Sequence, residues 1–194
     1  MAYKNDYKAV TGLRRIYIAV QTEDSKDGVS YGEVHEIDTP KTFGVAPEAS
    51  LEKAYAGDRI VETAQSRGGM QFNMEFHSLP EELKAELVGE DKRENGLTYE
   101  NSRQTSPYVG VIGEFTKEGG VSYFVGLPKA IVTPASIEGG TKEDGVEFGT
   151  LAFEGEAMER IFDGERKISK LSSDIDYDFS VLTKEVFKDS TVEA

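Results

Sequence analysis

The sequence contains no cysteine and no tryptophan, and its 36 acidic residues outnumber its 22 basic ones. The lack of cysteine excludes disulfides, thiolate metal sites and cysteine nucleophiles. The formal charge of −14 disfavours binding to free nucleic acid, because phosphate binding requires clustered Lys and Arg. No apolar run is long enough to span a membrane, and residues 1–15 lack the apolar region of a signal peptide. We therefore expect a cytoplasmic product.

What the sequence does contain is typical of a globular, mainly β protein. Of its 194 residues, 38% are hydrophobic, and nine Tyr and ten Phe are present. This length and composition are sufficient for one hydrophobic core. We expect a single domain over residues 1–194, with an N-terminal arm over 1–11, an extended loop over 41–69 and a C-terminal tail over 183–194.

The clearest local pattern is a strand that runs into a helix. From Met70 to Phe76 the sequence alternates strictly between apolar and polar residues, which is the period of a half-buried strand. The apolar set is expected in the core and the polar set on the opposite sheet face. The first set is Met70, Phe72, Met74 and Phe76, and the second is Gln71, Asn73 and Glu75.

After this strand the period becomes helical. Ser78 and Glu81 have the spacing of a capping box, and Pro80 suits a first helical turn. Apolar residues at Leu79, Leu83 and Leu87 follow at helical spacing, and Gly89 is placed to end the helix. This is the only helix that the sequence predicts with a consistent pattern.

Alternation and turn residues predict further strands on both sides of this unit. Between residues 41 and 69, Pro and Gly separate short β-like pieces, which we interpret as hairpin-like excursions with little core of their own. The pieces are Thr42–Val45, Leu51–Tyr55 and Ile60–Thr63. The other predicted strands are Leu13–Val20, Val29–Ile37, Tyr108–Thr116, Val121–Ile131, one from Val146 with a bulge near Gly149, and Asp174–Val181.

Residues suited to catalysis or metal binding are scarce. His35 and His77 lie in or beside strands with no motif around them, so we interpret them as ordinary surface histidines. The acids at 174, 176 and 178 lack the glycine and the distal glutamate of a calcium loop. Their spacing of two predicts instead the solvated face of a strand. We therefore predict no catalytic residue, no metal site and no cofactor, and expect a binding or structural protein rather than an enzyme.

The order of several segments resembles the major tail protein family, the tail tube proteins of long-tailed, non-contractile (siphovirus-type) phages. The resemblance covers roughly residues 12–158. It rests on the order and residue pattern of these segments rather than on a catalytic signature. The segments that carry it are Gly12–Tyr17, Val29–Gly32, Leu79–Gly89, Ser106–Val111, Ser122–Val125, and Asp144–Phe148 followed by Leu151.

This resemblance implies two packed β-sheets (sandwich- or barrel-like) flanked by a short helix, with a long mid-chain loop and terminal arms. It also implies a structural virion protein whose hexameric rings stack into a tail tube that conducts DNA during ejection. The expected partners are further copies of the chain, the tape measure, tail terminator and distal tail proteins, and passing double-stranded DNA without specific binding. The expected location is the virion tail, and the host cytoplasm during assembly.

Two sets of residues become candidates on this basis. The loop over 41–69 is expected to act in assembly, with Tyr55 as an aromatic anchor between the charges of Glu52, Lys53, Asp58 and Arg59. The polar row Gln71, Asn73 and Glu75 is expected to face the channel, with a solvated outer face as the alternative. An acidic channel wall leaves a passing duplex without phosphate anchors.

Two other functions remain open from the sequence. A β-sandwich that binds a small ligand or carbohydrate would need a concave apolar pocket, and the lack of tryptophan weakly disfavours a sugar-binding module. The tube protein of a contractile injection or secretion system shares the architecture, and composition does not separate it from a phage tube.

Overall fold

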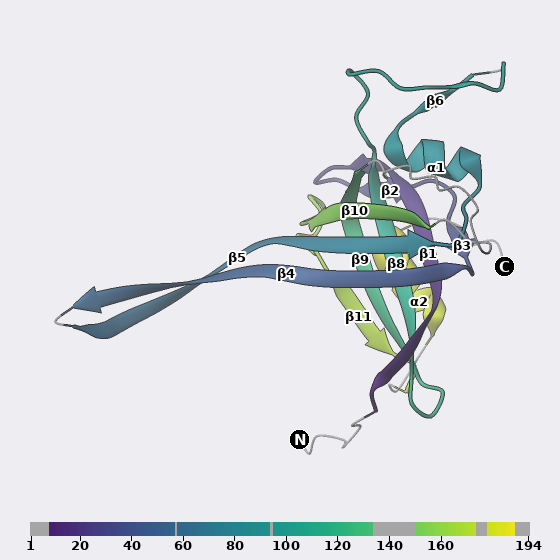
Figure 1. Ribbon diagram of the computed structural model, residues 1–194. Coiled ribbons are helices and arrows are strands. Elements are labelled where there is room, and N and C mark those ends of the chain that lie inside the picture. Colours follow the sequence, from purple (N-terminus) through teal and green to yellow (C-terminus); the bar gives the residue numbers. More distant parts are fainter. Residues whose placement is uncertain (1–7, 57, 94, 134–149, 174–177, 189–194) are drawn as a thin grey trace, which may run out of the picture.

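The computed structural model describes residues 8–56, 58–93, 95–133, 150–173 and 178–188. Over these residues the chain is mainly antiparallel β, which confirms the predicted fold class (Figure 1). The elements are β1 (Val10–Asp24), β2 (Val29–Tyr31), β3 (His35–Ile37), β4 (Pro40–Ala56), β5 (Arg59–Phe76), α1 (Glu81–Val88), β6 (Asp91–Lys92), β7 (Thr98–Tyr99), β8 (Tyr108–Lys117), β9 (Ser122–Thr133), β10 (Leu151–Met158), β11 (Ile168–Leu171) and α2 (Phe179–Phe187).

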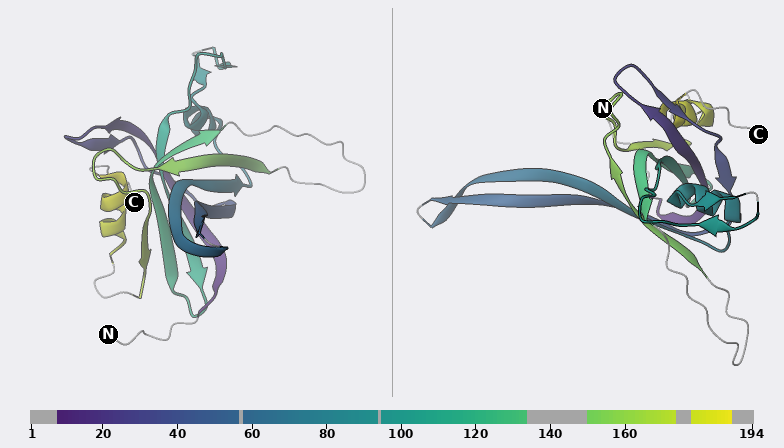
Figure 2. Two further views of the ribbon diagram at one scale, coloured as in Figure 1. Left: turned by 90° about the vertical axis from the view of Figure 1, so that its left-hand side faces the viewer. Right: turned by 90° about the horizontal axis from the view of Figure 1, so that it is seen from above.

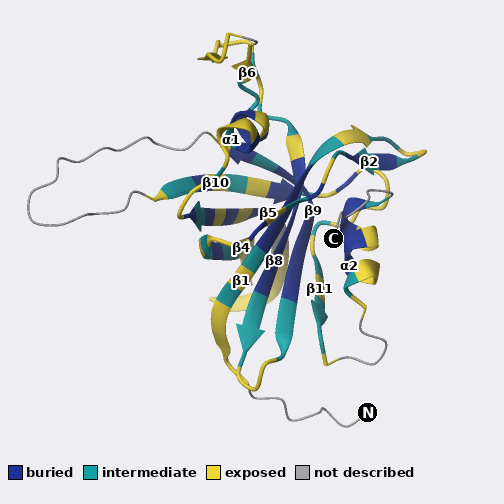
Figure 3. Cartoon of the chain, turned by 90° about the vertical axis from the view of Figure 1, so that its right-hand side faces the viewer, coloured by how far each residue is buried: buried dark blue, intermediate teal, exposed yellow. Residues whose placement is uncertain are grey.

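One sheet in the order β2-β1-β8-β9-β10-β5-β4 forms both layers of the body. The sheet changes direction at β9, whose outer edge pairs with β11 over 123–126 and with β10 over 129–133. As a result, β10, β5 and β4 cross over β1, β8 and β9 as a second layer (Figure 3). The main core lies between the layers and includes the predicted row Met70, Phe72, Met74 and Phe76, which is 0–5% exposed.

Helix α2 covers the opposite face of the β1-β8-β9 layer. Ile16 and Ile18 belong to the main core, whereas the alternating residues Tyr17 and Ala19 belong to a second core that includes Leu182, Val186 and Phe187 of α2. The helix packs so closely that a Cβ at Gly126 would lie 2.5 Å from a methyl group of Val186. The layer is therefore buried on both faces, as Figure 3 shows for its central strands.

The predicted helix after β5 is confirmed, but its predicted capping box is wrong. Helix α1 begins at Glu81 with the extended residue Pro80 as N-cap, and no side chain caps it. The Ser78 hydroxyl lies two residues before the N-cap and so is not placed for the N2 or N3 amide. Gly89 ends the helix in the left-handed region at φ 75°, as predicted.

The predicted last strand is wrong where the structure describes it. Phe179–Val181 begin α2, and the Asp178 side chain accepts a hydrogen bond from the Ser180 amide at 2.9 Å. The alternation is outweighed by helical spacing from Phe179 through Leu182 and Val186, which buries one face of α2. The predicted tail from residue 183 also begins too early, since 183–187 are helical. Residues 174–177 and 189–194 lie outside the described residues.

Other predicted elements need smaller corrections. The expected strand over 29–37 is two short strands, β2 and β3, which pair with successive parts of β1. The separate pieces predicted between residues 41 and 63 lie within the continuous strands β4 and β5. Strands β8 and β9 form the predicted hairpin, with Gly119 and Gly120 at φ 80° and 77° in its turn. The bulge expected near Gly149 lies outside the described residues.

Candidate assembly surfaces

The most prominent feature outside the body is the hairpin of β4 and β5. Close to the body, residues 40–47 of β4 pair with residues 70–76 of β5, which in turn pair with β10. Beyond a register shift, residues 49–56 pair only with residues 59–67, and this outer part, here called the ribbon, projects away from the two layers (Figure 2). At about 3.3 Å per residue, the ribbon extends by roughly 25 Å.

The ribbon carries every predicted assembly residue on its exposed surface. Glu52, Lys53, Tyr55, Asp58 and Arg59 are all exposed, and Asp58 adopts φ 56° in the turn. Large apolar side chains accompany them, with exposed fractions from 48% to 67%, namely Leu51, Tyr55, Ile60 and Val61. An isolated two-stranded ribbon is only marginally stable in water. These exposed apolar groups are the kind that mark an interaction surface.

The two faces of the ribbon differ in character. Directly paired residues share a face, so Tyr55 lies with Ile60, and Lys53 lies with Thr63. One face, here called the apolar ribbon face, therefore consists of Leu51, Lys53, Tyr55, Ile60, Thr63 and Gln65. Among these six residues, Lys53 is the only charged one. The opposite face carries Glu52, Glu62 and Arg59 among small residues, and Val61 lies at the register shift without a direct partner in the other strand.

The predicted polar row lies on the outer face of the β10-β5-β4 layer. Gln71 and Asn73 are exposed, and Glu75 is half-buried and accepts a hydrogen bond from the Thr42 hydroxyl at 3.1 Å. On β10, Glu156 pairs with Gln71 and Glu154 with Asn73, so carboxylates flank the row. The structure thus places Gln71, Asn73 and Glu75 opposite the core, as predicted, and their exposure to a channel stays a prediction.

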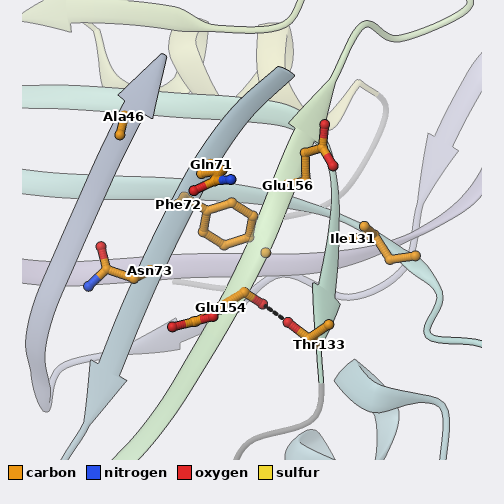
Figure 4. A pocket seen from close by; sticks show the side chains of 9 residues that line it. Ala46, Gln71, Phe72, Asn73, Ile131, Thr133, Glu154 and Glu156 are labelled. Atoms are coloured by element: carbon orange, nitrogen blue, oxygen red, sulfur yellow. Dashed lines mark hydrogen bonds between the residues drawn. The ribbon is translucent and has the colours of Figure 1, made fainter. Parts of the chain in front are cut away.

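A shallow cavity of about 420 Å³ lies on this face (Figure 4). Its lining includes Gln71, Asn73, Glu154 and Glu156, and the Thr133 hydroxyl donates a hydrogen bond to the Glu154 carbonyl at 2.7 Å. No Lys or Arg is present among the outward-facing described residues of this layer within 42–46 of β4, 71–75 of β5 and 152–156 of β10. The carboxylates make this face unfavourable for anions, and the cavity lining combines these polar groups with Ala46, Phe72 and Ile131.

Neither histidine belongs to a cluster suited to chemistry. His35 Nε2 lies 3.9 Å from a carboxylate oxygen of Glu86, and the His77 amide donates to the Thr39 carbonyl. Among the described residues, no three His, Asp or Glu side chains are arranged to hold a metal ion. Within the same ranges, no helix is long and apolar enough to cross a membrane.

Sequence reasoning missed a buried charged network between β1, β9 and the turn after β10. The Asp24 carboxylate accepts hydrogen bonds from Lys129 Nζ at 2.6 Å and from the amides of Ile161 and Phe162 at 3.0 and 3.2 Å. Burial raises the pKa of Asp24, but these hydrogen bonds outweigh burial and hold the pKa below its usual range. Asp24 gave no local signal in the polar run 22–27, because its partners are more than 100 residues away in sequence.

Arg160 is the second missed residue and is 1% exposed. Its guanidinium donates to the carbonyls of Val186 and Glu185 at 2.9 and 3.1 Å and to the Tyr31 hydroxyl at 3.3 Å. Its Nε and Nη2 groups also donate to the two carboxylate oxygens of Asp163. This single side chain therefore ties the turn after β10 to α2 and to β2.

Comparison with known proteins gives one family. The family model described as phage tail tube protein matches residues 11–194. No match was found among curated protein sequences. One similar solved chain comes from a structure described as the cryo-EM structure of the anti-feeding prophage (AFP) baseplate, 6-fold symmetrised. It shares 12% identity over 88% of this chain and 97% of that chain, with a TM-score of 0.41.

Proposed function

Because the chain belongs to the phage tail tube protein family, a family of structural proteins of the virion tail, we propose that it forms stacked hexameric rings that conduct DNA. The observation that carries this proposal is the ribbon, whose apolar side chains are exposed although they extend far from the body. Such a surface is stabilised when another molecule covers it.

Ring closure requires a contact between two different surfaces of neighbouring copies. The ordered path of the sheet ends at β2 on one side and at β4 on the other. Among the described residues, no strand pairs with the outer edge of β4, so its backbone N–H and C=O groups are available for pairing with another strand. We infer that the free edge of β4 pairs with a neighbouring copy, and that the ribbon and terminal arms lock one ring to the next.

The outer face of the β10-β5-β4 layer is our candidate for the channel wall. Its carboxylates at Glu75, Glu154 and Glu156 would repeat around each ring, and none of the outward-facing residues within 42–46, 71–75 and 152–156 is a cation that could hold the phosphates of a duplex. Such a wall guides double-stranded DNA without binding it. The proposed partners are other copies, the tape measure, tail terminator and distal tail proteins, with assembly in the host cytoplasm.

Electron microscopy of the purified protein at rising concentration tests this function, with analytical ultracentrifugation in parallel. We expect rings or tubes to appear above a threshold concentration, because self-association depends on protomer concentration. The proposed function would be contradicted if the protein stays monomeric at all concentrations, also after other tail proteins are added. A melting temperature that rises with a small ligand would then favour a ligand-binding sandwich.

A further inference from the structure

The turn that joins β10 to β11 presents a second exposed apolar surface. Ile161 is 55% exposed and Phe162 is 40% exposed, and both lie in residues 159–165. Tyr108, which is 41% exposed, is linked to them through Lys129, whose Nζ lies 4.5 Å from the Tyr108 ring centroid and 2.6 Å from Asp24. We call Tyr108, Ile161 and Phe162 the turn patch.

The turn patch is held rigid from beneath. Asp24 accepts from the amides of Ile161 and Phe162, and Arg160 joins the same turn to the C-terminal end of α2. Both anchors are buried, and the Lys129 and Asp24 side chains are 7% and 6% exposed. A preorganised apolar surface loses little conformational entropy on binding, which is typical of interface anchors. Ile161 and Phe162 are not part of the main core.

The turn patch and the apolar ribbon face complement each other in charge. Glu159 and Glu165 flank the turn patch and are exposed. Of the six residues that define the apolar ribbon face, the only charged one is the cation Lys53, beside Tyr55 and Ile60. The opposite ribbon face carries Glu52 and Glu62 with a single cation, Arg59, so its net charge is negative and complements the acidic surroundings of the turn patch less well. The ribbon projects away from its own body, so it meets a turn patch of another copy rather than its own (Figure 1).

We propose that the apolar ribbon face of one copy docks on the turn patch of a second copy, with Tyr55 against Phe162 and Lys53 against Glu159 and Glu165. This inference rests on the proposed function and names the surface that receives the ribbon. The contact joins two different surfaces, so it is heterologous. In a row of copies joined in this way, the first and last copies keep a free ribbon and a free turn patch, so further copies can add.

Site-directed crosslinking tests the contact without background, because the protein has no cysteine. The double variant Thr63→Cys with Glu159→Cys leaves both apolar anchors in place, and a short bismaleimide should join copies into a ladder when tubes form. The matched control pairs Thr63→Cys with Leu97→Cys, at a residue that is 57% exposed on the β6–β7 turn. A ladder that forms only in the first variant supports the contact. A ladder that forms only in the control overturns it.

Charge reversal provides a second, independent measurement. Lys53→Glu should raise the concentration needed for assembly about tenfold, in line with coupling energies of close interfacial charge pairs. Adding Glu165→Lys to this variant should return the threshold towards that of the wild type. Purely additive losses in the double variant would overturn the proposed pairing. Normal tubes of the Thr63→Cys/Glu159→Cys variant that give no crosslinked ladder would refute this contact alone, whereas a wild type that never assembles would refute both proposals.

Discussion

At the residue scale, the most constrained side chain is the one that sequence patterns did not single out. Arg160 is the largest fully buried side chain of the described residues, and its donors serve two carbonyls, one hydroxyl and one carboxylate. A buried guanidinium is costly to desolvate unless all its donors are paired. Its value for the fold therefore lies in position: it connects three elements that are far apart in sequence.

Replacing Arg160 should be strongly destabilising. Arg160→Met removes the charged partner of Asp163 and the side-chain donor to the carbonyls of Glu185 and Val186, and we expect a loss of about 3–5 kcal/mol in the free energy of unfolding. Arg103→Met, at an exposed position, should change it by less than about 0.5 kcal/mol. Urea denaturation of both variants measures the difference, and similar midpoints would show that the network contributes little.

Asp24 should make stability depend on acid pH. Its pKa is lower in the folded protein than the usual value, so the unfolded chain binds the proton more readily. The stabilisation is present above the ordinary aspartate pKa of about 3.9 and is lost as pH falls through the lower folded pKa. Melting temperatures measured from pH 6 down to pH 2.5 should fall less steeply in Asp24→Asn than in the wild type. An unchanged slope would contradict the role assigned to the Asp24–Lys129 pair.

At the scale of elements, α2 decides how the outer face of the β1-β8-β9 layer is covered. The Phe179 ring lies 4.9 Å from that of Tyr17 and 5.2 Å from that of Phe124, and Phe187 lies against Tyr31 at 5.8 Å. These contacts are available to a helix that presents one face. A strand of the same residues would place Val181 inside and Leu182 outside.

A pair of substitutions distinguishes the helix from the predicted strand. Leu182 is 2% exposed in α2, so Leu182→Ala should cost about 2–5 kcal/mol in the free energy of unfolding. Val181 is 45% exposed, and Val181→Ala should cost less than about 0.5 kcal/mol. Chemical denaturation compares them. The reverse order of effects is the outcome expected for strand parity.

The ribbon should be required for assembly and dispensable for folding. Deleting residues 50–53 together with their pairing partners 63–66 removes four cross-strand pairs, preserves the register and shortens the ribbon by about 13 Å. We expect a monomer with wild-type melting behaviour that no longer forms tubes, because none of the described side chains among these residues belongs to either core. Normal tubes from this variant, seen by electron microscopy, would count against the ribbon, and so would an unfolded monomer.

At the scale of the whole molecule, the acidic outer face of the β10-β5-β4 layer would affect function only when copies assemble into a ring. The face with Gln71, Asn73 and Glu75 is polar and acidic, and in a single copy it is simply solvated. Around a ring, the same carboxylates would define the potential of a narrow channel. A test must therefore be made on assembled tails.

Glu75→Lys should slow DNA ejection if this face lines the channel. A ring of ammonium groups would attract a duplex that carries one charge per about 1.7 Å, and salt would weaken the attraction. We expect slower ejection from otherwise normal particles and partial recovery at higher ionic strength. Glu118→Lys, on the exposed β8–β9 turn, serves as the control. Ejection at wild-type rates at both salt concentrations would place Glu75 outside the channel.

The sequence by itself determined the features that depend on neighbouring residues. The alternation over Met70–Phe76, the leucines of α1, the stop at Gly89 and the β8–β9 hairpin were predicted and are confirmed. Each is local, because side-chain period and backbone preference act over a few residues. The polar row opposite the core followed from the same alternation, although its exposure to a channel stays a prediction.

Only the tertiary structure decided the rest, because it depends on partners that are distant in the chain. In α2 the apolar residues satisfy both a strand and a helix pattern over a few positions, and packing against Tyr17 and Phe124 selects the helix. The sharing of one edge of β9 by β10 and β11 follows from long-range pairing, which no local pattern specifies. The same holds for Asp24 with Lys129 and for Arg160 with α2: isolated charges in the sequence become a network because the fold buries them together.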